Sequence, residues 1–568
     1  MRKFLLSTAI AASLPMVTPA AAQPEHDPDR LGRGAALAEA GAPDSRPNFL
    51  VIVADDLGFS DLGAFGGEIA TPNLDALAHS GVRFTGFHTA PTCSPTRAAL
   101  LTGTDHHQAG LGTMAEQLAP NQKGRPNYEG VLRPDLATLP ERLRTAGYRT
   151  LFSGKWHLGL KPAQDPHARG FERSFALLQG AGNHFGRGLS ANPAKGTTYT
   201  EDGKVLTALP ANFYSSDAFA GKLVDELRVS GSGEGGKRPF FAYLAFTAPH
   251  WPLQAPAEDI ARYRGAYDAG FEVLRQQRLA REEALGLVPA GTAAHSPRLQ
   301  AGGWDWLSAD QKRAAARNME IYAAMVDRLD RSVGKVIDEL RRSGQLANTV
   351  IVFLADNGAE GLDAETTGAQ MLKDRLAHAD NSLANRGAAT SYVTYGPGWA
   401  QGATAPSWGI KGYATEGGTR TASFIAGRGL GQPGTVATTY LTVADIAPTL
   451  LDLADVPYSG TRFGQRTVRP VTGRSWVPWL TGKADRVYGP GDAVGEELFG
   501  SRSLRQGDWK ITDIGDGVWR LFDIAADPGE TRDLALEQPE RARALAAAWD
   551  EYARANGVIL PDAVTYRP

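Results

Sequence analysis

Continuous apolar segments mark the expected strands of this chain. Residues 48–54 read Asn-Phe-Leu-Val-Ile-Val-Ala, and similar runs recur at 148–152, 240–246 and 349–354. Strands without a polar face are typical of parallel sheets that are covered on both sides. These four runs therefore predict the central strands of a mostly parallel sheet.

Helical patterns lie between the apolar runs. The longest covers 308–342 and starts with Ser-Ala-Asp-Gln, which fits a capping box, and a shorter one covers 139–146. Alternating strands and helices predict an α/β fold with a large mixed, mostly parallel sheet flanked by helices. Segments 161–210 and 253–307 are rich in Gly, Pro and Ala, and we expect irregular insertions there.

The pattern changes near residue 455. A short apolar helix is expected at 445–453, and beyond it the chain has short strand-like segments and a closing helix at 540–556. This predicts a main domain over 46–455 and a smaller α+β domain over 456–568. Residues 23–45 have no clear period and are interpreted as a linker.

The first residues resemble a secretory signal. Arg2 and Lys3 precede an apolar stretch at 4–17 and a run of alanines at 20–22. This predicts a signal peptide over 1–22 and an exported protein, periplasmic or secreted. A membrane anchor is the alternative, but the apolar stretch is too short for one. We expect no membrane span elsewhere.

Composition narrows the class of partner. The chain has 568 residues, of which 42% are hydrophobic, and a formal net charge of -3. A large core is therefore possible, and no basic field for nucleic acid is expected, so the partner should be a small molecule. The single cysteine, Cys93, cannot form an internal disulfide.

Polar residues follow each apolar run. They are Asp55 and Asp56, then Lys155 and His157, then His250, and finally Asp356 and Asn357. Parallel sheets bind ligands beyond the carboxyl ends of their strands, so these side chains are expected to meet at one site.

Four of these residues form an all-oxygen set that suits Ca²⁺ or Mg²⁺, namely Asp55, Asp56, Asp356 and Asn357. Neighbouring ligands need an irregular backbone, because successive residues of a regular strand point to opposite faces. Either pair alone would be interpreted as a turn or a helix cap. Their joint position after two apolar runs favours a metal site.

The basic residues have alternative interpretations. Lys155 and His157 are two positions apart, which places both on one face of an extended chain, but a surface lysine and a partly buried histidine would give the same spacing. His250 lies between Pro249 and a Trp-Pro pair, in a stiff turn that either aims the imidazole at a ligand or holds it in a structural hydrogen bond.

Cys93 is followed by Ser-Pro and by a short helical segment that Gly103 closes. It is therefore expected at a helix N-terminus, where the dipole stabilises an anion, with Arg97 one turn further on. An inert buried thiol is the alternative. The flanking residues favour a reactive one.

The segment 93–103, Cys-Ser-Pro-Thr-Arg-Ala-Ala-Leu-Leu-Thr-Gly, resembles the signature of the type I sulfatases. The resemblance extends over most of the chain after residue 47. It includes the polar strand endings and Lys411 with the glycine that follows it. Segments 112–116 and 411–418 are most similar to bacterial arylsulfatases.

The resemblance implies an alkaline phosphatase-like fold and hydrolysis of aryl sulfate esters. It implies that a maturation enzyme oxidises Cys93 to Cα-formylglycine, which hydrates to a gem-diol. It also implies one Ca²⁺ ion, held by the residue at position 93 together with Asp55, Asp56, Asp356 and Asn357. We expect a monomer.

The resemblance and the chemistry together assign roles. Arg97 and the metal would stabilise the nucleophilic oxygen, while Lys155 and Lys411 would neutralise the sulfate. His250 would protonate the leaving alcohol, and His157 would take the proton that releases sulfate. Asp356 would also accept a proton during attack. His106 and His107 are expected mainly to be structural or to support the site residues from behind.

Two other functions fit part of the sequence. A phosphonate or phosphate ester hydrolase of the same fold is the first, although the Asp356 and Asn357 pair argues against a second metal ion. A non-catalytic protein that binds an anion or Ca²⁺ is the second. Such a binder would have no need of Cys93, His157 and His250 together.

Overall fold

The computed structural model describes residues 45–230, 238–297, 303–366, 372–563 and 565–566. The expected signal peptide at 1–22, and the expected linker up to residue 44, lie outside the described residues. Among the described helices, none combines the length and apolarity that crossing a lipid bilayer requires.

A ten-stranded sheet forms the centre of the fold. Five strands in its middle are parallel, in the order β9 (Thr349–Ala355), β1 (Asn48–Asp55), β8 (Phe240–Pro249), β4 (Arg149–Lys155) and β5 (Arg173–Leu177). The four apolar runs are four of these strands, so the predicted fold class is confirmed. The outer strands are β11 (Thr435–Ala437), β2 (Val82–Phe84) and β10 (Ser423–Ala426) beside β9, and β6 (Tyr199–Glu201) and β7 (Lys204–Val205) beside β5.

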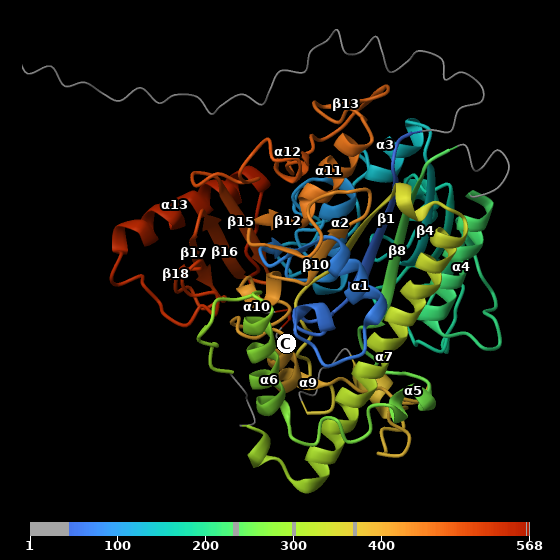
Figure 1. Cartoon of the computed structure of the whole chain (residues 1–568), viewed down its shortest axis with the longest axis vertical. Coiled ribbons are helices and arrows are strands. Elements are labelled where there is room, and N and C mark those ends of the chain that lie inside the picture. Colours follow the sequence, from blue (N-terminus) through green and yellow to red (C-terminus); the bar gives the residue numbers. More distant parts are fainter. Residues whose placement is uncertain (1–44, 231–237, 298–302, 367–371, 564, 567–568) are drawn as a thin grey trace, which may run out of the picture. The chain divides into compact units, whose positions relative to one another are not determined.

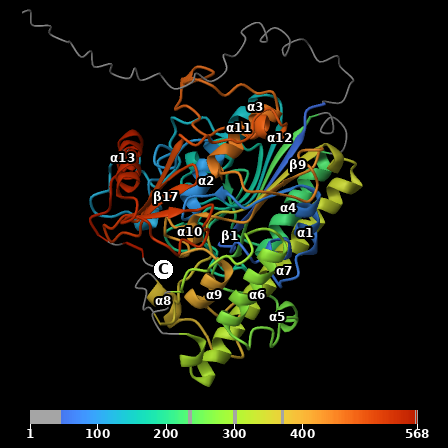
Figure 2. The same cartoon turned by 60° about the vertical axis from the view of Figure 1, so that its left-hand side comes forward.

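Alternate residues of the central strands feed two separate cores. Leu50 and Ile52 of β1 pack with helices α1 (Pro72–Ser80), α4 (Ser215–Ser230) and α7 (Ala309–Arg342). Val51 and Val53 pack on the opposite face with α2 (Cys93–Thr102), α3 (Leu139–Thr145) and α11 (Ile446–Leu453). Figure 2 shows the two helical layers on either side of the sheet. A strand covered on both faces needs the continuous apolar run that the sequence has.

Helix α7 is the predicted long helix. The Ser308 hydroxyl accepts a hydrogen bond from the backbone N–H of Gln311 at 3.3 Å, and the Gln311 side chain accepts one from the N–H of Ser308 at 2.8 Å. The capping box is therefore confirmed. Its predicted apolar face is fully buried, through Ile321, Met325, Leu329, Val333, Val336 and Leu340.

The expectation of an irregular segment at 253–307 is wrong. This segment contains α5 (Ala257–Ala261) and the longer α6 (Phe271–Ala284). The inner face of α6 carries Arg278, which is buried and donates to Glu68 at 2.8 Å. Because part of the buried face is ionic, the apolar period that identifies most helices is weak here. The segment 161–210 likewise contains β5, β6 and β7 rather than only irregular chain.

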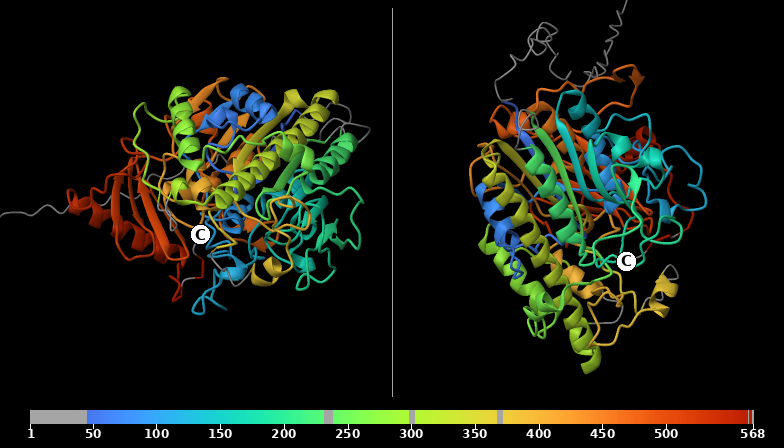
Figure 3. Two further views of the ribbon diagram at one scale, coloured as in Figure 1. Left: turned by 90° about the horizontal axis from the view of Figure 1, so that it is seen from below. Right: turned by 90° about the vertical axis from the view of Figure 1, so that its right-hand side faces the viewer.

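A second, antiparallel sheet lies in the C-terminal region. Its strands are β15 (Ala493–Leu498), β16 (Ser501–Gln506), β17 (Trp509–Asp513) and β18 (Arg520–Asp523), in that order. Helix α13 (Pro539–Asn556) covers it through Leu545 and Trp549 (Figure 3). The small α+β region is therefore present, and the domain boundary at residue 456 stays a prediction.

Further short strands and helices connect these elements, and some of them are labelled in Figure 1. They are β3 (Phe87–His88), β12 (Leu441–Thr442), β13 (Arg462–Phe463), β14 (Arg466–Thr467), α8 (Lys373–Ala377), α9 (Gly396–Ala403), α10 (Glu416–Thr419) and α12 (Val477–Leu480).

Candidate active site

The polar strand endings meet at one edge of the sheet. Possible ligand atoms of Asp55, Cys93 and Asp356 all lie within 4.8 Å of one another, and so do those of Asp55, Asp56 and His250. These residues are buried and follow β1, β8 and β9, or begin α2. The structure therefore assembles residues that are up to 301 positions apart.

The backbone at this edge is irregular, as expected for adjacent site residues. The register of β1 against β8 shifts between Val53 and Asp55. Asp56 has a φ of 66° and His157 a φ of 59°, in the left-handed region that costs a non-glycine residue about 1–2 kcal/mol. The turn lets Asp55 and Asp56 both take part in the same site.

Cys93 is the first residue of α2, and Gly103 closes this helix with a φ of 64°. The predicted position at a helix N-terminus is confirmed. Its Sγ lies 3.3 Å from Nδ1 of His157. Burial raises the pKa of the Cys93 thiol, but the charges of Lys155 and His157 outweigh it and lower the pKa to about 5. In the unmodified chain Cys93 is therefore a thiolate at neutral pH.

His157 lies between two acidic partners. Its Nδ1 faces Cys93, and its Nε2 lies 3.3 Å from Oε1 of Glu116. Burial lowers the pKa of His157, but the thiolate and Glu116 raise it to about 9. A carboxylate on the far nitrogen fixes the orientation of the ring that faces position 93.

One oxygen of each carboxylate is held by a basic side chain. The pairs are Lys155 Nζ with Asp55 Oδ2 at 2.6 Å, Lys411 Nζ with Asp56 Oδ1 at 2.7 Å, and Arg97 Nη2 with Asp356 Oδ2 at 2.7 Å. Arg97 also donates to the Lys155 carbonyl at 2.9 Å. The six residues thus form one buried network of alternating charge.

Two oxygens of this network, and one of the neighbouring Asn357, have no hydrogen-bond partner among the described residues. They are Asp55 Oδ1, Asp56 Oδ2 and Asn357 Oδ1, and all three are buried. The Asn357 amide donates to Asp56 Oδ1 at 2.7 Å, which leaves its own oxygen unused. A buried acceptor without a partner costs about 1–3 kcal/mol, so such a cluster needs a ligand. An all-oxygen set fits Ca²⁺ or Mg²⁺.

The carboxylate pKa values agree with this fit. Burial, and then the charge of Asp356, raise the pKa of Asp55 well above its usual value. Burial raises the pKa of Asp56 to about 7 despite the nearby Lys411. Burial also raises the pKa of Asp356, but the charges of Arg97 and the nearby lysines outweigh it and lower this pKa. Ionising Asp55 and Asp56 as well is therefore unfavourable unless further positive charge is present.

His250 has one nitrogen committed to the backbone. Its Nδ1 lies 2.6 Å from the Trp251 carbonyl, which can only accept, so this nitrogen carries a proton. Its Nε2 lies 3.5 Å from Asp56 Oδ2. Burial, with Lys411 and Lys155, holds the pKa of His250 well below its usual value, so Nε2 is unprotonated before a ligand enters.

Two acidic residues of the site were missed by the sequence reasoning. Glu116 partners His157, and Glu360 lies 3.0 Å from the Lys411 ammonium. The place of each residue in the sequence could have indicated that it belongs to the site. Glu116 ends the segment 112–116 that already resembled arylsulfatases, and Glu360 lies three residues after Asn357.

Two aromatic residues close in sequence to the predicted site, Trp251 and Tyr413, lie in different surroundings. The Trp251 ring packs beside the site, with its centroid 4.5 Å from that of the His250 ring and 6.0 Å from that of the Tyr392 ring. Tyr413 lines a cavity of about 660 Å³. None of the predicted catalytic residues lines that cavity.

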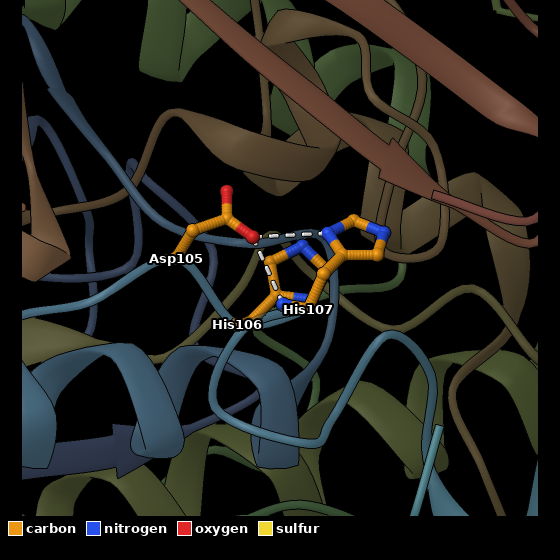
Figure 4. A group of neighbouring side chains, drawn as sticks. All are labelled: Asp105, His106 and His107. Atoms are coloured by element: carbon orange, nitrogen blue, oxygen red, sulfur yellow. Dashed lines mark hydrogen bonds and ion pairs between the residues drawn. The ribbon is translucent and has the colours of Figure 1, made fainter. Parts of the chain in front are cut away.

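A second cluster of possible ligands, Asp105, His106 and His107, follows α2 (Figure 4). His107 is held between Asp105 at 3.1 Å and Glu497 at 3.3 Å, and His106 contacts the Leu111 carbonyl at 2.8 Å and Glu496 at 2.7 Å. Every ring nitrogen of His106 and His107 therefore already has a hydrogen-bond partner. The cluster thus connects the chain after α2 to β15, in agreement with the structural role expected of both histidines.

Comparisons with known proteins agree on one family. The model of the family described as Sulfatase matches residues 47–456. An arylsulfatase of Klebsiella aerogenes is 38% identical over 440 residues, which span 76% of this chain and 92% of that protein. An uncharacterized sulfatase of Schizosaccharomyces pombe is 46% identical over 534 residues, spanning 91% and 95%. The crystal structure of Ps i-CgsB has a TM-score of 0.65 at 24% identity, covering 91% and 94%, and so shares the fold.

Proposed function

Since this chain belongs to the sulfatase family and hydrolyses sulfate esters, we propose that its substrates are aryl sulfates, cleaved to a phenol and inorganic sulfate. The resemblance of segment 93–103 to the type I sulfatases is confirmed by this membership. The observation that carries the aryl preference is the similarity to the Klebsiella arylsulfatase, which extends over nearly all of that protein.

Sulfatases of this family generally use a formylglycine and a divalent metal. We propose that Cys93 is the residue converted and that the ion is a single Ca²⁺ held by position 93, Asp55, Asp56, Asp356 and Asn357. When both are present, the hydrated aldehyde supplies a hydroxyl nucleophile, and the cation supplies charge that favours its ionised form. The three oxygens without partners support this ligand set.

The basic residues bind and orient the sulfate group. Lys155 uses one ammonium hydrogen on Asp55, and Lys411 uses two, on Asp56 and Glu360, so each keeps at least one hydrogen for the anionic oxygens of the ester. Both ammonium groups are buried, so their attraction for a sulfate is little weakened by water. Arg97 holds Asp356 through two nitrogens and adds positive charge near position 93.

The two histidines handle protons at separate atoms. Conversion of Cys93 removes the thiolate that raises the pKa of His157 in the unmodified chain. His157 Nδ1 faces position 93 and can then accept the proton of its second hydroxyl, while Glu116 holds the opposite nitrogen. His250 can deliver a proton from Nε2 to the leaving oxygen. Burial, together with Lys411 and Lys155, keeps the pKa of His250 low, and the negative charge of a bound sulfate would offset the two lysines.

Parallel assays on an aryl sulfate and on an aryl phosphonate monoester test the substrate class. We expect a higher kcat/KM for the sulfate, and a higher value for the phosphonate would reverse the assignment. Mass spectrometry of the peptide that contains Cys93 tests the conversion. An unmodified thiol in fully active protein would exclude the formylglycine.

We also propose that the protein is exported, to the periplasm or outside the cell, and that it is a monomer. Export rests on residues 1–22 of the sequence. The mass of the protein recovered from each cell fraction tests the first proposal, since removal of the signal peptide shortens the chain. Light scattering of the purified protein tests the second.

A further inference from the structure

Glu360 is a buried carboxylate that gathers side chains from three distant parts of the chain. Its Oε2 lies 3.0 Å from the Lys411 ammonium and accepts a hydrogen bond from Trp251 Nε1 at 3.3 Å. Its Oε1 accepts one from the Leu362 N–H at 2.9 Å. The Tyr566 hydroxyl lies 2.8 Å from Oε1 and 3.0 Å from Oε2.

Tyr566 reaches this carboxylate from close to the end of the sequence, 206 positions after Glu360. Its ring packs on Phe499, in the turn between β15 and β16, at 5.1 Å between centroids. Burial, and then the charge of Glu360, hold the pKa of the phenol well above its usual value. The hydroxyl therefore keeps its proton and donates a hydrogen bond to the carboxylate.

Lys411 is held by two carboxylates, Asp56 at 2.7 Å and Glu360 at 3.0 Å. A lysine side chain carries about 2 kcal/mol of rotamer entropy, so its anchors decide where the ammonium group stays. With two N–H bonds used in this way, one remains for a substrate oxygen. The position of Glu360 thus affects the contact between Lys411 and the sulfate.

We infer that Tyr566 is a positioning residue for Lys411, acting through Glu360, so that the C-terminal tail completes the sulfate-binding site. This inference rests on the proposed role of Lys411 in the sulfatase reaction. Without the phenol, one donor to Glu360 is lost. The carboxylate can then move, and the ammonium group with it.

The backbone of the segment that carries Lys411 is held separately. Ser501 accepts a hydrogen bond from the Ala414 N–H at 2.9 Å, and Glu530 accepts one from the Glu416 N–H at 2.8 Å. Lys510 also contacts the Glu416 carboxylate at 2.8 Å. Loss of the Tyr566 hydroxyl should therefore leave the fold of this segment intact and alter only side-chain placement.

The test is a pair of double-mutant cycles on matured, Ca²⁺-loaded full-length protein. We expect Tyr566→Phe alone to lower kcat/KM by about tenfold, the loss expected for a hydrogen bond to a charged group. Added to Glu360→Ala, or to Lys411→Ala, the same change should lower kcat/KM by less than about twofold, because the residue it acts through is gone. The second background serves where the first does not fold.

Tyr552→Phe is the matched control. The Tyr552 hydroxyl also donates to a carboxylate, the partly buried Asp105 Oδ2, at 2.8 Å, but Tyr552 lies on α13. We expect this variant to keep kcat/KM within about twofold of the wild type, with a similar change in melting temperature to Tyr566→Phe.

Wild-type kcat/KM for Tyr566→Phe would overturn the inference. So would an equal loss in the wild-type and both mutant backgrounds, since that result means the phenol acts independently of Glu360 and Lys411. The cycles compare variants on whichever sulfate ester the wild type hydrolyses. A wild type that is inactive on aryl sulfates but active on another sulfate ester would therefore contradict the proposed substrate and leave the cycles decisive.

Discussion

The two ends of helix α2 carry similar clusters of possible metal-ligating residues. The clusters differ in how completely their polar atoms are hydrogen-bonded. At the first residue of α2, Cys93 meets Asp55 and Asp356, with possible ligand atoms within 4.8 Å of one another. Beyond the last turn of α2 there is a second such cluster, in which possible ligand atoms of Asp105, His106 and His107 also lie within 4.8 Å of one another. At the first end three buried oxygens have no partner among the described residues, whereas every histidine nitrogen in the second cluster is bonded.

This difference separates a site that needs a ligand from an ion-pair network that is already complete. Buried polar atoms are almost always bonded in native proteins, so a group of unpaired ones identifies a missing partner. Residue type and proximity alone would have given both clusters the same assignment. The bonding of individual atoms distinguishes them.

The largest contrast is expected from Cys93→Ala. Removing the residue that we propose as the source of the nucleophile should lower kcat at least about a thousandfold. The fold should persist, because Cys93 contributes a small side chain at the start of a well-packed helix. Initial rates with an aryl sulfate measure the loss, and circular dichroism checks the fold. Near-wild-type turnover in this variant would contradict the proposed mechanism.

The opposite result is expected from His107→Gln at the other end. Removing a buried cation between Asp105 and Glu497 should lower the free energy of unfolding by about 3–5 kcal/mol. The kcat of the folded fraction should change less than about twofold. Denaturant titration and active-site-normalised rates measure the two quantities. A large fall in kcat at unchanged stability would place this cluster in the catalytic machinery.

Ca²⁺ should stabilise the folded protein through the site at Cys93 and not through the cluster at His107. At a concentration 100 times its Kd, an ion bound only by the folded state adds about 2.7 kcal/mol to stability. Melting curves with Ca²⁺ and with a chelator should therefore differ in the wild type and in His107→Gln, and differ much less in Asn357→Ala. If His107→Gln abolished the shift while Asn357→Ala kept it, the assignment of the two ends would be reversed.

The last contrast is a pH dependence of the second cluster. Burial lowers the pKa of His107, but hydrogen bonds to Asp105 and Glu497 outweigh it and raise the pKa to about 10. The other groups that face this ring are His106, Tyr128 and Tyr552. An unfolded histidine has a pKa of about 6.5, so the stabilisation is complete below that pH and disappears as the pH rises towards 10.

The measurement is the difference in unfolding free energy between the wild type and His107→Gln. It should be largest near pH 6 and shrink steadily up to pH 10. A difference that grows with pH would show that His107 is neutral in the folded protein.

The central strands and the long helix could be predicted from the sequence because their burial is apolar and follows a clear period. The runs at 48–54 and 349–354 became β1 and β9, and the capping box at Ser308 begins α7. Helix α6 was not predicted, because Arg278 and Glu282 occupy its buried face. Where ionic contacts replace apolar ones, the pattern of hydrophobic residues no longer reports burial.

The candidate site was predictable where its residues follow strands of a parallel sheet. Asp55, Asp356 and Lys155 satisfy that rule, and the structure brings them together. Glu360 and Tyr566 do not, since one lies in a loop and the other comes from the far end of the chain. Contacts of that kind depend on the path of the whole chain, which no local pattern encodes.

The bonds between the C-terminal sheet and the segment that carries Lys411 limit how this protein can be recombined. Ser501, Glu530 and Lys510 contact that segment, and Tyr566 contacts Glu360. A chimera that takes this region from a relative would import foreign partners for the segment that carries Lys411. The C-terminal region is therefore not an exchangeable module, and its sequence should vary together with the segment 411–419 in any functional hybrid.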